Sequence, residues 1–154
     1  MSRSCAILGL MRTNVKVLFF DCFGVLVLHQ PSSEHIFEYV WKKDKNLLNF
    51  IRRQKTNGLK IGIISNVAQY QFDEFFSRKE QAELFDFLVL SGEVGCAKPN
   101  SRIFKIAIEK SNVLPSEIAF FDDSILNVES AQKVGIQGFL YKNWEDFSKE
   151  FKED

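Results

Sequence analysis

The sequence has no excess of either charge, few cysteines and no long apolar run. Its 154 residues carry 20 basic and 20 acidic side chains, so charge gives no reason to expect nucleic acid as a partner. The three cysteines, Cys5, Cys22 and Cys96, are irregularly spaced, which argues against a disulfide framework and a zinc site with paired ligands. No stretch approaches the roughly 20 apolar residues that cross a bilayer, and the opening MSRSCAILGLM lacks a cleavage signal. We therefore expect a cytoplasmic protein without a membrane partner.

The composition is that of a folded domain. Hydrophobic residues make up 45% of the chain and charged residues 26%, which is enough apolar material for a core and excludes disorder for most of the chain. The 16 phenylalanines are scattered from Phe19 to Phe151, so we expect most of them to pack inside the protein.

Short apolar runs recur along the chain and have the character of buried strands. Each is almost continuously apolar, as expected where helices cover both faces of a parallel sheet. The predicted strands are Val15 to Phe20, Leu59 to Ser65, Phe87 to Ser91, Ile118 to Phe121 and, more weakly, Gly138 to Tyr141.

Segments with helical spacing of apolar residues lie between these runs. Residues 34–56 are predicted as one long helical segment that ends at Asn57-Gly58, with the polar stretch 42–46 as a point of interruption. Further helices are predicted over 103–108, after a Pro-Asn-Ser start signal, and over 125–134. This alternation predicts an α/β fold, a three-layer α/β sandwich with a mainly parallel sheet, whose functional edge is at the carboxyl ends of the strands.

Polar residues follow the predicted strands, and they would converge at this edge. They are Asp21 after the first strand, Ser65 and Asn66 at the end of the second, and Asp122 and Asp123 after the fourth, with Lys98 ahead of the helix that leads to the fourth. Neighbouring carboxylates repel one another, so such a site favours a divalent cation, and oxygen ligands suit magnesium. Lysine and serine side chains are suited to holding phosphoryl oxygens.

These segments resemble the four motifs of the haloacid dehalogenase (HAD) superfamily of hydrolases. The matching stretches are FFDCFGVL, GIISN, GCAKP and FFDDSILN, in the family's order, within a resemblance that covers Val15 to about Tyr141. The resemblance implies a Rossmann-like core of the subfamily I type. The order also excludes the receiver domain of response regulators, because there the acidic pair comes near the first strand.

The resemblance implies a magnesium-dependent phosphohydrolase that acts on a phosphorylated substrate, small or macromolecular. Asp21 would be the nucleophile that forms an aspartyl-phosphate, and Ser65, Asn66 and Lys98 would bind the phosphate, with Ser65 and Lys98 also counted as catalytic. Mg²⁺ would be held by Asp21, the main-chain carbonyl of Phe23 and Asp123. Asp122 and Asn127 would support these ligands from close by.

Phe23 departs from the family pattern. Typical family phosphatases have an aspartate two positions after the nucleophile, and it protonates the leaving group and later activates water. General acid–base help contributes about 10²–10⁴-fold, so its loss predicts slow turnover without loss of phosphate or metal binding. Three alternatives stay open: a slow phosphatase, a phosphate- and metal-binding or regulatory protein with little turnover, and a dehalogenase-like hydrolase.

The chain also leaves little room for the helical cap that relatives carry between the first two motifs, because only residues 22–64 lie there. We therefore expect an N-terminal tail over residues 1–13 and one HAD-like core domain over 14–154 without an inserted cap. The missing cap counts against the dehalogenase alternative, which needs a lid over its substrate. The sequence leaves open whether Met1 or Met11 is the native start.

The segment from Glu34 to Ile51 has more apolar residues than one sheet-facing stripe requires, which covers about a 100° arc. A wide buried face would explain the excess. Alternatively, part of this surface contacts a second subunit, in a homo-oligomer, or a macromolecular substrate. The sequence assigns no role to His29, His35, Cys22 or Cys96.

Overall fold

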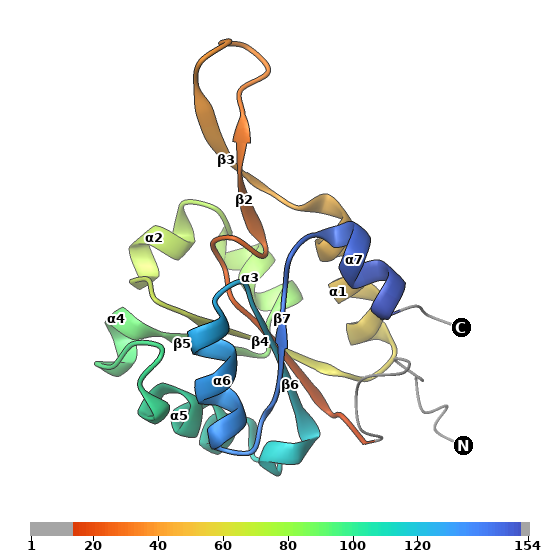
Figure 1. The fold of residues 1–154 in the computed structure, drawn as a ribbon, viewed down its shortest axis with the longest axis vertical. Helices are drawn as coiled ribbons and strands as arrows, with labels where there is room; N and C mark the ends of the chain where they lie inside the picture. Colours follow the sequence, from red (N-terminus) through yellow and green to blue (C-terminus); the bar gives the residue numbers. More distant parts are fainter. Residues whose placement is uncertain (1–13, 152–154) are drawn as a thin grey trace.

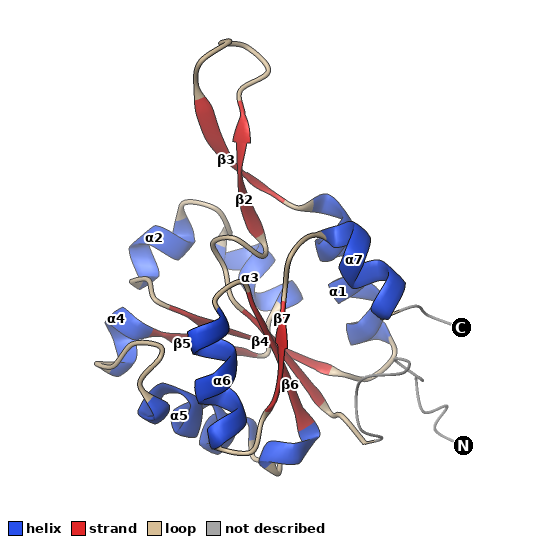
Figure 2. Ribbon diagram, in the orientation of Figure 1, coloured by secondary structure: helices blue, strands red, loops and turns tan. Residues whose placement is uncertain are grey.

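A computed structural model describes residues 14–151, which contain a five-stranded parallel sheet with helices on both faces (Figures 1 and 2). The strand order is β5-β4-β1-β6-β7. The strands are β1 (Val17–Phe20), β4 (Lys60–Ser65), β5 (Phe87–Leu90), β6 (Ile118–Asp122) and β7 (Gln137–Leu140). Neighbouring strands are parallel throughout. The predicted α/β sandwich with a mainly parallel sheet is confirmed.

Alternate residues of the central strand face two separate hydrophobic layers, as the two-residue period of a strand requires. Leu18 and Phe20 pack in a core with α1 (Lys45–Thr56), α2 (Gln69–Asp73), α3 (Arg78–Leu84) and α7 (Trp144–Glu150). Val17 and Phe19 pack on the opposite face with α5 (Ser101–Ser111) and α6 (Ile125–Lys133). A short α4 (Ser91–Val94) and a 3₁₀ helix, η1 (Pro115–Glu117), complete the connections.

Phenylalanine fills most of this core. The buried rings include Phe19, Phe20, Phe50, Phe72, Phe76, Phe85, Phe104, Phe120, Phe121, Phe147 and Phe151. Edge-to-face pairs recur between the sheet and α7, with a centroid separation of 5.2 Å between Phe121 and Phe147, for example. The expectation that the phenylalanines mostly serve packing is confirmed.

The single helix predicted over residues 34–56 is wrong for its first part. Residues 27–43 form an antiparallel hairpin of β2 (Val27–Pro31) and β3 (Tyr39–Lys43), which projects from the body of the molecule (Figure 1). The helix α1 begins only at Lys45, because the Asp44 side chain accepts hydrogen bonds from the N–H groups of Asn46 and Leu47 at 2.9 and 3.2 Å. Aromatic and β-branched residues in β3 favour the strand over the helix.

The predicted tail over residues 1–13, with Cys5 and both candidate start methionines, lies outside the described residues. The stretch between Asp21 and Ser65 consists of a turn, the β2–β3 hairpin, α1 and β4. Within residues 14–151, none of the helices combines the length and apolar character that a membrane span requires.

Candidate active site

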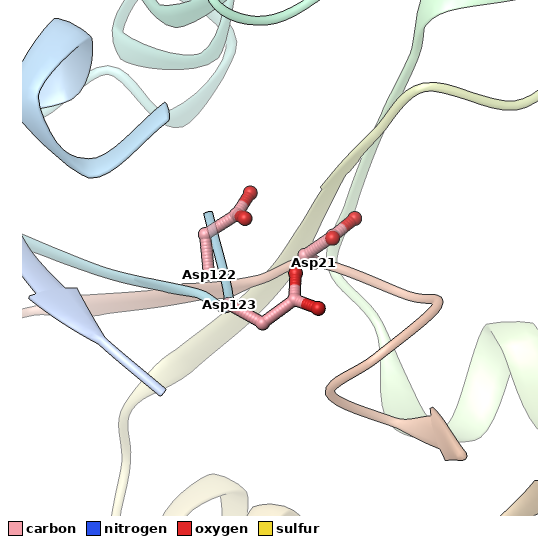
Figure 3. Close-up of side chains that lie close together, drawn as sticks. All are labelled: Asp21, Asp122 and Asp123. Carbon is pink, nitrogen blue, oxygen red and sulfur yellow. The ribbon is translucent and has the colours of Figure 1, made fainter. Parts of the chain in front are cut away.

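Three aspartates lie together at the carboxyl ends of two neighbouring strands. Asp21 follows β1, Asp122 ends β6 and Asp123 comes next, and β1 and β6 are paired in parallel with Phe20 opposite Phe121. The three side chains occupy one small region of this edge (Figure 3). One carboxylate oxygen from each lies within 4.8 Å of the others, so the set can surround a single cation.

Lys98 links two of these carboxylates. Its Nζ lies 2.9 Å from Oδ1 of Asp21 and 2.6 Å from Oδ2 of Asp122, and its side chain is only 1% exposed. The Asn66 side chain donates to the Lys98 carbonyl at 2.9 Å and accepts from the Lys98 N–H at 2.8 Å. The structure therefore uses the Asn66 amide to position Lys98, while its predicted contact with substrate stays a prediction.

Asp122 is fully buried and both of its carboxylate oxygens already have partners. Besides the bond from Lys98, they accept from the Ser124 N–H at 2.8 Å and from Asn127 Nδ2 at 3.1 and 3.2 Å. Asp122 therefore holds Lys98 directly, and Asn127 orients Asp122, whereas the predicted support of the metal ligands by these two residues stays a prediction. Asp123 and Oδ2 of Asp21 have fewer partners among the described residues and are the carboxylate groups best placed to bind a cation.

The site carries more negative charge than Lys98 neutralises. Burial raises the pKa of Asp21, and the neighbouring Asp122 adds to this, whereas Lys98 opposes it. Burial and the charge of Asp122 likewise raise the pKa of Asp123. Carboxylates in this situation gain from a divalent cation, and their oxygen atoms are the ligands that magnesium prefers. The residues present therefore fit the predicted magnesium ion.

The turn after Asp21 brings the main chain against Asp123. The Cys22 carbonyl accepts from the N–H groups of Val25, Leu26 and Val27, which tightens the turn. Gly24 has φ +86°, and a Cβ at this position would lie 2.2 Å from Oδ2 of Asp123. The positive φ favours glycine here, and the missing side chain lets the Gly24 main chain lie beside the Asp123 carboxylate.

Ser65 is buried at the end of β4, next to β1 in the sheet, so it lies at the same edge as Asp21. Cys22 is also buried, and burial raises the pKa of its thiol far above the ordinary value. A thiol that stays protonated is a poor nucleophile, so Cys22 acts as a small hydrophobic residue. Cys96 is partly exposed.

The side chain of Phe23 points into a set of aromatic rings that sequence reasoning missed. Its ring meets Trp41 of β3 edge-on at a centroid distance of 5.0 Å and Phe75 at 5.3 Å. His29 is exposed in β2, and its ring stacks on Trp41 at 4.8 Å, while His35 is exposed in the hairpin loop. Phe23 thus connects the turn at the nucleophile position to the hairpin.

Residues 26–140 match the family described as haloacid dehalogenase-like hydrolase. Among curated relatives, the haloacid dehalogenase-like hydrolase domain-containing protein 3 of Mus musculus is 28% identical over 71% of this chain and 46% of its own length. A phosphorylated carbohydrates phosphatase of Thermotoga maritima is 25% identical over 68% of this chain and 48% of its own. The chain thus spans about half the length of these relatives.

Solved structures share the fold. A HAD family enzyme of Bacteroides thetaiotaomicron, crystallised with magnesium and inorganic phosphate, aligns with a TM-score of 0.73 and 20% identity, covering 90% of this chain and 100% of that chain. A predicted HAD-like family hydrolase of Porphyromonas gingivalis aligns with a TM-score of 0.72 and 17% identity, covering 92% and 100%.

Proposed function

Because the chain belongs to the haloacid dehalogenase-like hydrolases, we propose that it is a magnesium-dependent phosphohydrolase with Asp21 as its nucleophile. The observation that carries the proposal is the cluster of Asp21, Asp123 and Lys98 at one sheet edge, with its excess of negative charge. Relatives described as phosphatases, of phosphorylated carbohydrates and of D-ribitol 5-phosphate, support a phosphorylated substrate.

In the proposed reaction a carboxylate oxygen of Asp21 attacks phosphorus, and the bond between phosphorus and the ester oxygen breaks. Lys98 and Ser65 contact the phosphoryl oxygens, and the leaving oxygen takes its proton from water. Water then attacks the phosphorus of the aspartyl-phosphate, which releases inorganic phosphate and frees Asp21. Asp21, Asp123 and the Phe23 carbonyl would hold magnesium, which would supply positive charge to offset the negative charge of the phosphoryl group.

We expect turnover to be slow because Phe23 can neither donate nor accept a proton. The test is hydrolysis of p-nitrophenyl phosphate with magnesium by the wild type, by Asp21→Asn and by Asp146→Asn, an exposed carboxylate on α7 that serves as a matched control. Activity should be lost in Asp21→Asn and when EDTA removes the metal, and kept in Asp146→Asn. Equal activity in Asp21→Asn and the wild type would overturn the proposal.

A second candidate is a phosphate- and metal-binding or regulatory protein with little turnover. The observation that favours it is Phe23, whose ring is held by Trp41 and Phe75 and leaves no acid at that position. Calorimetry with magnesium and beryllium fluoride separates the two candidates. Binding without detectable hydrolysis favours the second, and hydrolysis that depends on Asp21 excludes it.

A dehalogenase-like hydrolase is the third candidate, because aromatic residues occur at the Phe23 position in that branch of the family. The stretch between Asp21 and Ser65 forms a narrow hairpin and α1, which counts against a lid that encloses a small organic acid. We expect no halide release from 2-chloropropionate at enzyme concentrations that hydrolyse p-nitrophenyl phosphate.

A further inference from the structure

Exposed apolar side chains are gathered at the end of the molecule that carries the site. In the described part of the chain, the large exposed hydrophobic residues are Ile36, Phe37, Tyr39, Trp41, Tyr70, Ile125, Leu126, Leu140 and Leu114. All of them except Leu114 lie at the carboxyl end of a sheet strand or on the segment that directly follows one. An apolar rim around a polar site is typical of a binding surface.

Part of this rim is continuous with the candidate active site. The ring of Phe23 contacts Trp41 at 5.0 Å, Trp41 stacks on His29 at 4.8 Å, and His29 contacts Tyr39 at 5.1 Å. We call these four residues the aromatic row. It starts two residues after Asp21 and runs outward along the hairpin. Trp41 is 45% exposed and Tyr39 is 61% exposed.

Hairpin stability alone does not account for this arrangement. His29 and Trp41 are directly opposite in the β2–β3 register, so their stacking stabilises the pair of strands. Ile36 and Phe37 in the connecting loop, however, are 92% and 95% exposed and bury almost nothing within the chain. Their position extends the apolar surface beyond the row, away from the nucleophile.

We propose that the aromatic row binds the organic part of the substrate, and that the substrate is a phosphomonoester with a large, flat and apolar leaving group. The inference rests on the proposed phosphohydrolase function. Phe23, the inner end of the row, comes two residues after Asp21, so a phosphate held at Asp21 and Lys98 would lie close to the row. Aromatic rings offer apolar surface against which a flat group packs, and no carboxylate or ammonium group interrupts the row.

The row favours such a substrate over a second copy of the chain. Contacts between copies at the hairpin tip would use Ile36 and Phe37, but they would not require rings that continue inward to the residue beside the nucleophile. A ligand anchored through its phosphate would contact the row from its inner end outward. Association of two copies is the competing explanation, and the test distinguishes it by the oligomeric state.

The test compares phenyl phosphate with 2-naphthyl phosphate, whose leaving groups are chemically similar but differ by one fused ring. We expect kcat/KM for the naphthyl ester to be about tenfold higher, from the additional apolar area removed from water. Trp41→Gln should reduce this ratio to about one, and Tyr39→Gln should reduce it less. Leu114→Gln removes an exposed apolar side chain at the opposite end and should leave the ratio unchanged. Taking a ratio cancels any common effect on the chemical step.

Failure of the proposal and failure of the proposed function give different results. Hydrolysis that depends on Asp21 but shows no naphthyl preference, or a preference that both hairpin variants retain, overturns the aromatic row as the binding surface. If no ester is hydrolysed, the proposed function fails, and calorimetry with phenylphosphonate and 2-naphthylphosphonate measures the row directly. Equal affinities overturn the proposal, and tighter naphthyl binding lost in Trp41→Gln supports it. A dimer in light scattering that Trp41→Gln dissociates overturns it in favour of a second copy.

Discussion

Replacing Phe23 by aspartate should increase phosphatase activity while weakening the fold. The new carboxyl group can protonate the leaving oxygen and later activate water, which is worth about 10²–10⁴-fold, or roughly 2.7–5.5 kcal/mol of activation free energy. Phe23 is half-buried and makes two edge-on ring contacts, at 5.0 Å with Trp41 and 5.3 Å with Phe75. The two ring pairs contribute about 0.5–1.5 kcal/mol each, and the half-buried apolar area adds about 1 kcal/mol, so the cost is about 2–4 kcal/mol.

That cost corresponds to a melting temperature lower by about 6–12 °C in a domain of this size. Phe23→Asn is the matched control, because asparagine removes the same ring and has the size of aspartate but carries no transferable proton. The assay measures kcat for n-butyl phosphate and p-nitrophenyl phosphate with all three proteins below their melting temperatures. The ratio of Phe23→Asp to Phe23→Asn isolates the proton transfer.

We expect that ratio to reach about 10²-fold for n-butyl phosphate, whose alkoxide leaves poorly without a proton, and to be smaller for p-nitrophenyl phosphate. Any gain common to both esters reports faster hydrolysis of the aspartyl-phosphate. Equal rates for the aspartate and asparagine variants on both esters, with both proteins folded, would refute the reasoning that a missing acid limits the proposed reaction.

Three further predictions concern the site and its scaffold. Lys98→Met leaves the buried carboxylates of Asp21 and Asp122 without their cation. Urea unfolding should show a free energy of unfolding lower by about 3–5 kcal/mol, and magnesium should recover part of it. An unchanged unfolding midpoint would contradict this. In Gly24→Ala the new Cβ would lie 2.2 Å from Oδ2 of Asp123, so the Asp123 carboxylate must move and calorimetry should show weaker magnesium binding. Wild-type magnesium affinity in this variant would exclude a role for the close approach. The Lys16 ammonium, 2.7 Å away, holds the pKa of Glu117 below its ordinary value, with the Leu114 N–H assisting. Glu117→Gln should therefore lower the melting temperature at pH 7. The difference should disappear in acid, as the pH falls through the lowered pKa of Glu117 and the wild-type carboxylate becomes protonated. A difference independent of pH would reject that assignment.

The sheet and the position of the site could be predicted because both depend on short-range patterns. Each strand is a short apolar run, and the polar residues that follow it are fixed by chain connectivity at the same edge. The arrangement within the site could not be read in this way. The two bonds between Asn66 and the main chain of Lys98, for example, join residues 32 positions apart, and no local signal predicts such a pair.

The hairpin was missed because the spacing of its apolar residues is ambiguous. Ile36, Phe37, Val40 and Trp41 fit one helical face, but Tyr39 to Trp41 also have the aromatic and β-branched character of a strand. The pairing of β3 with β2 decides between them, and a single sequence does not display that pairing. Asp44 was an available signal, since an aspartate ahead of an apolar period marks a helix start.

In the proposed reaction, Phe23 would connect the chemistry of the site to the choice of substrate. Its side chain removes the acid that an alkyl ester needs, because an alcohol is about as weakly acidic as water, with a pKa of about 15.7, and leaves poorly as an alkoxide. An aryl ester releases a phenol with a pKa of about 10 and depends much less on that proton. The same ring forms the inner end of the aromatic row, which offers a surface for a flat apolar group. Under the proposed function, Phe23 would thus disfavour alkyl phosphates and favour aryl phosphates by two independent physical effects. Phe23→Asp should therefore narrow the preference for 2-naphthyl over n-butyl phosphate in two ways. The new acid should speed hydrolysis of the butyl ester, and loss of the ring should weaken binding of the naphthyl ester.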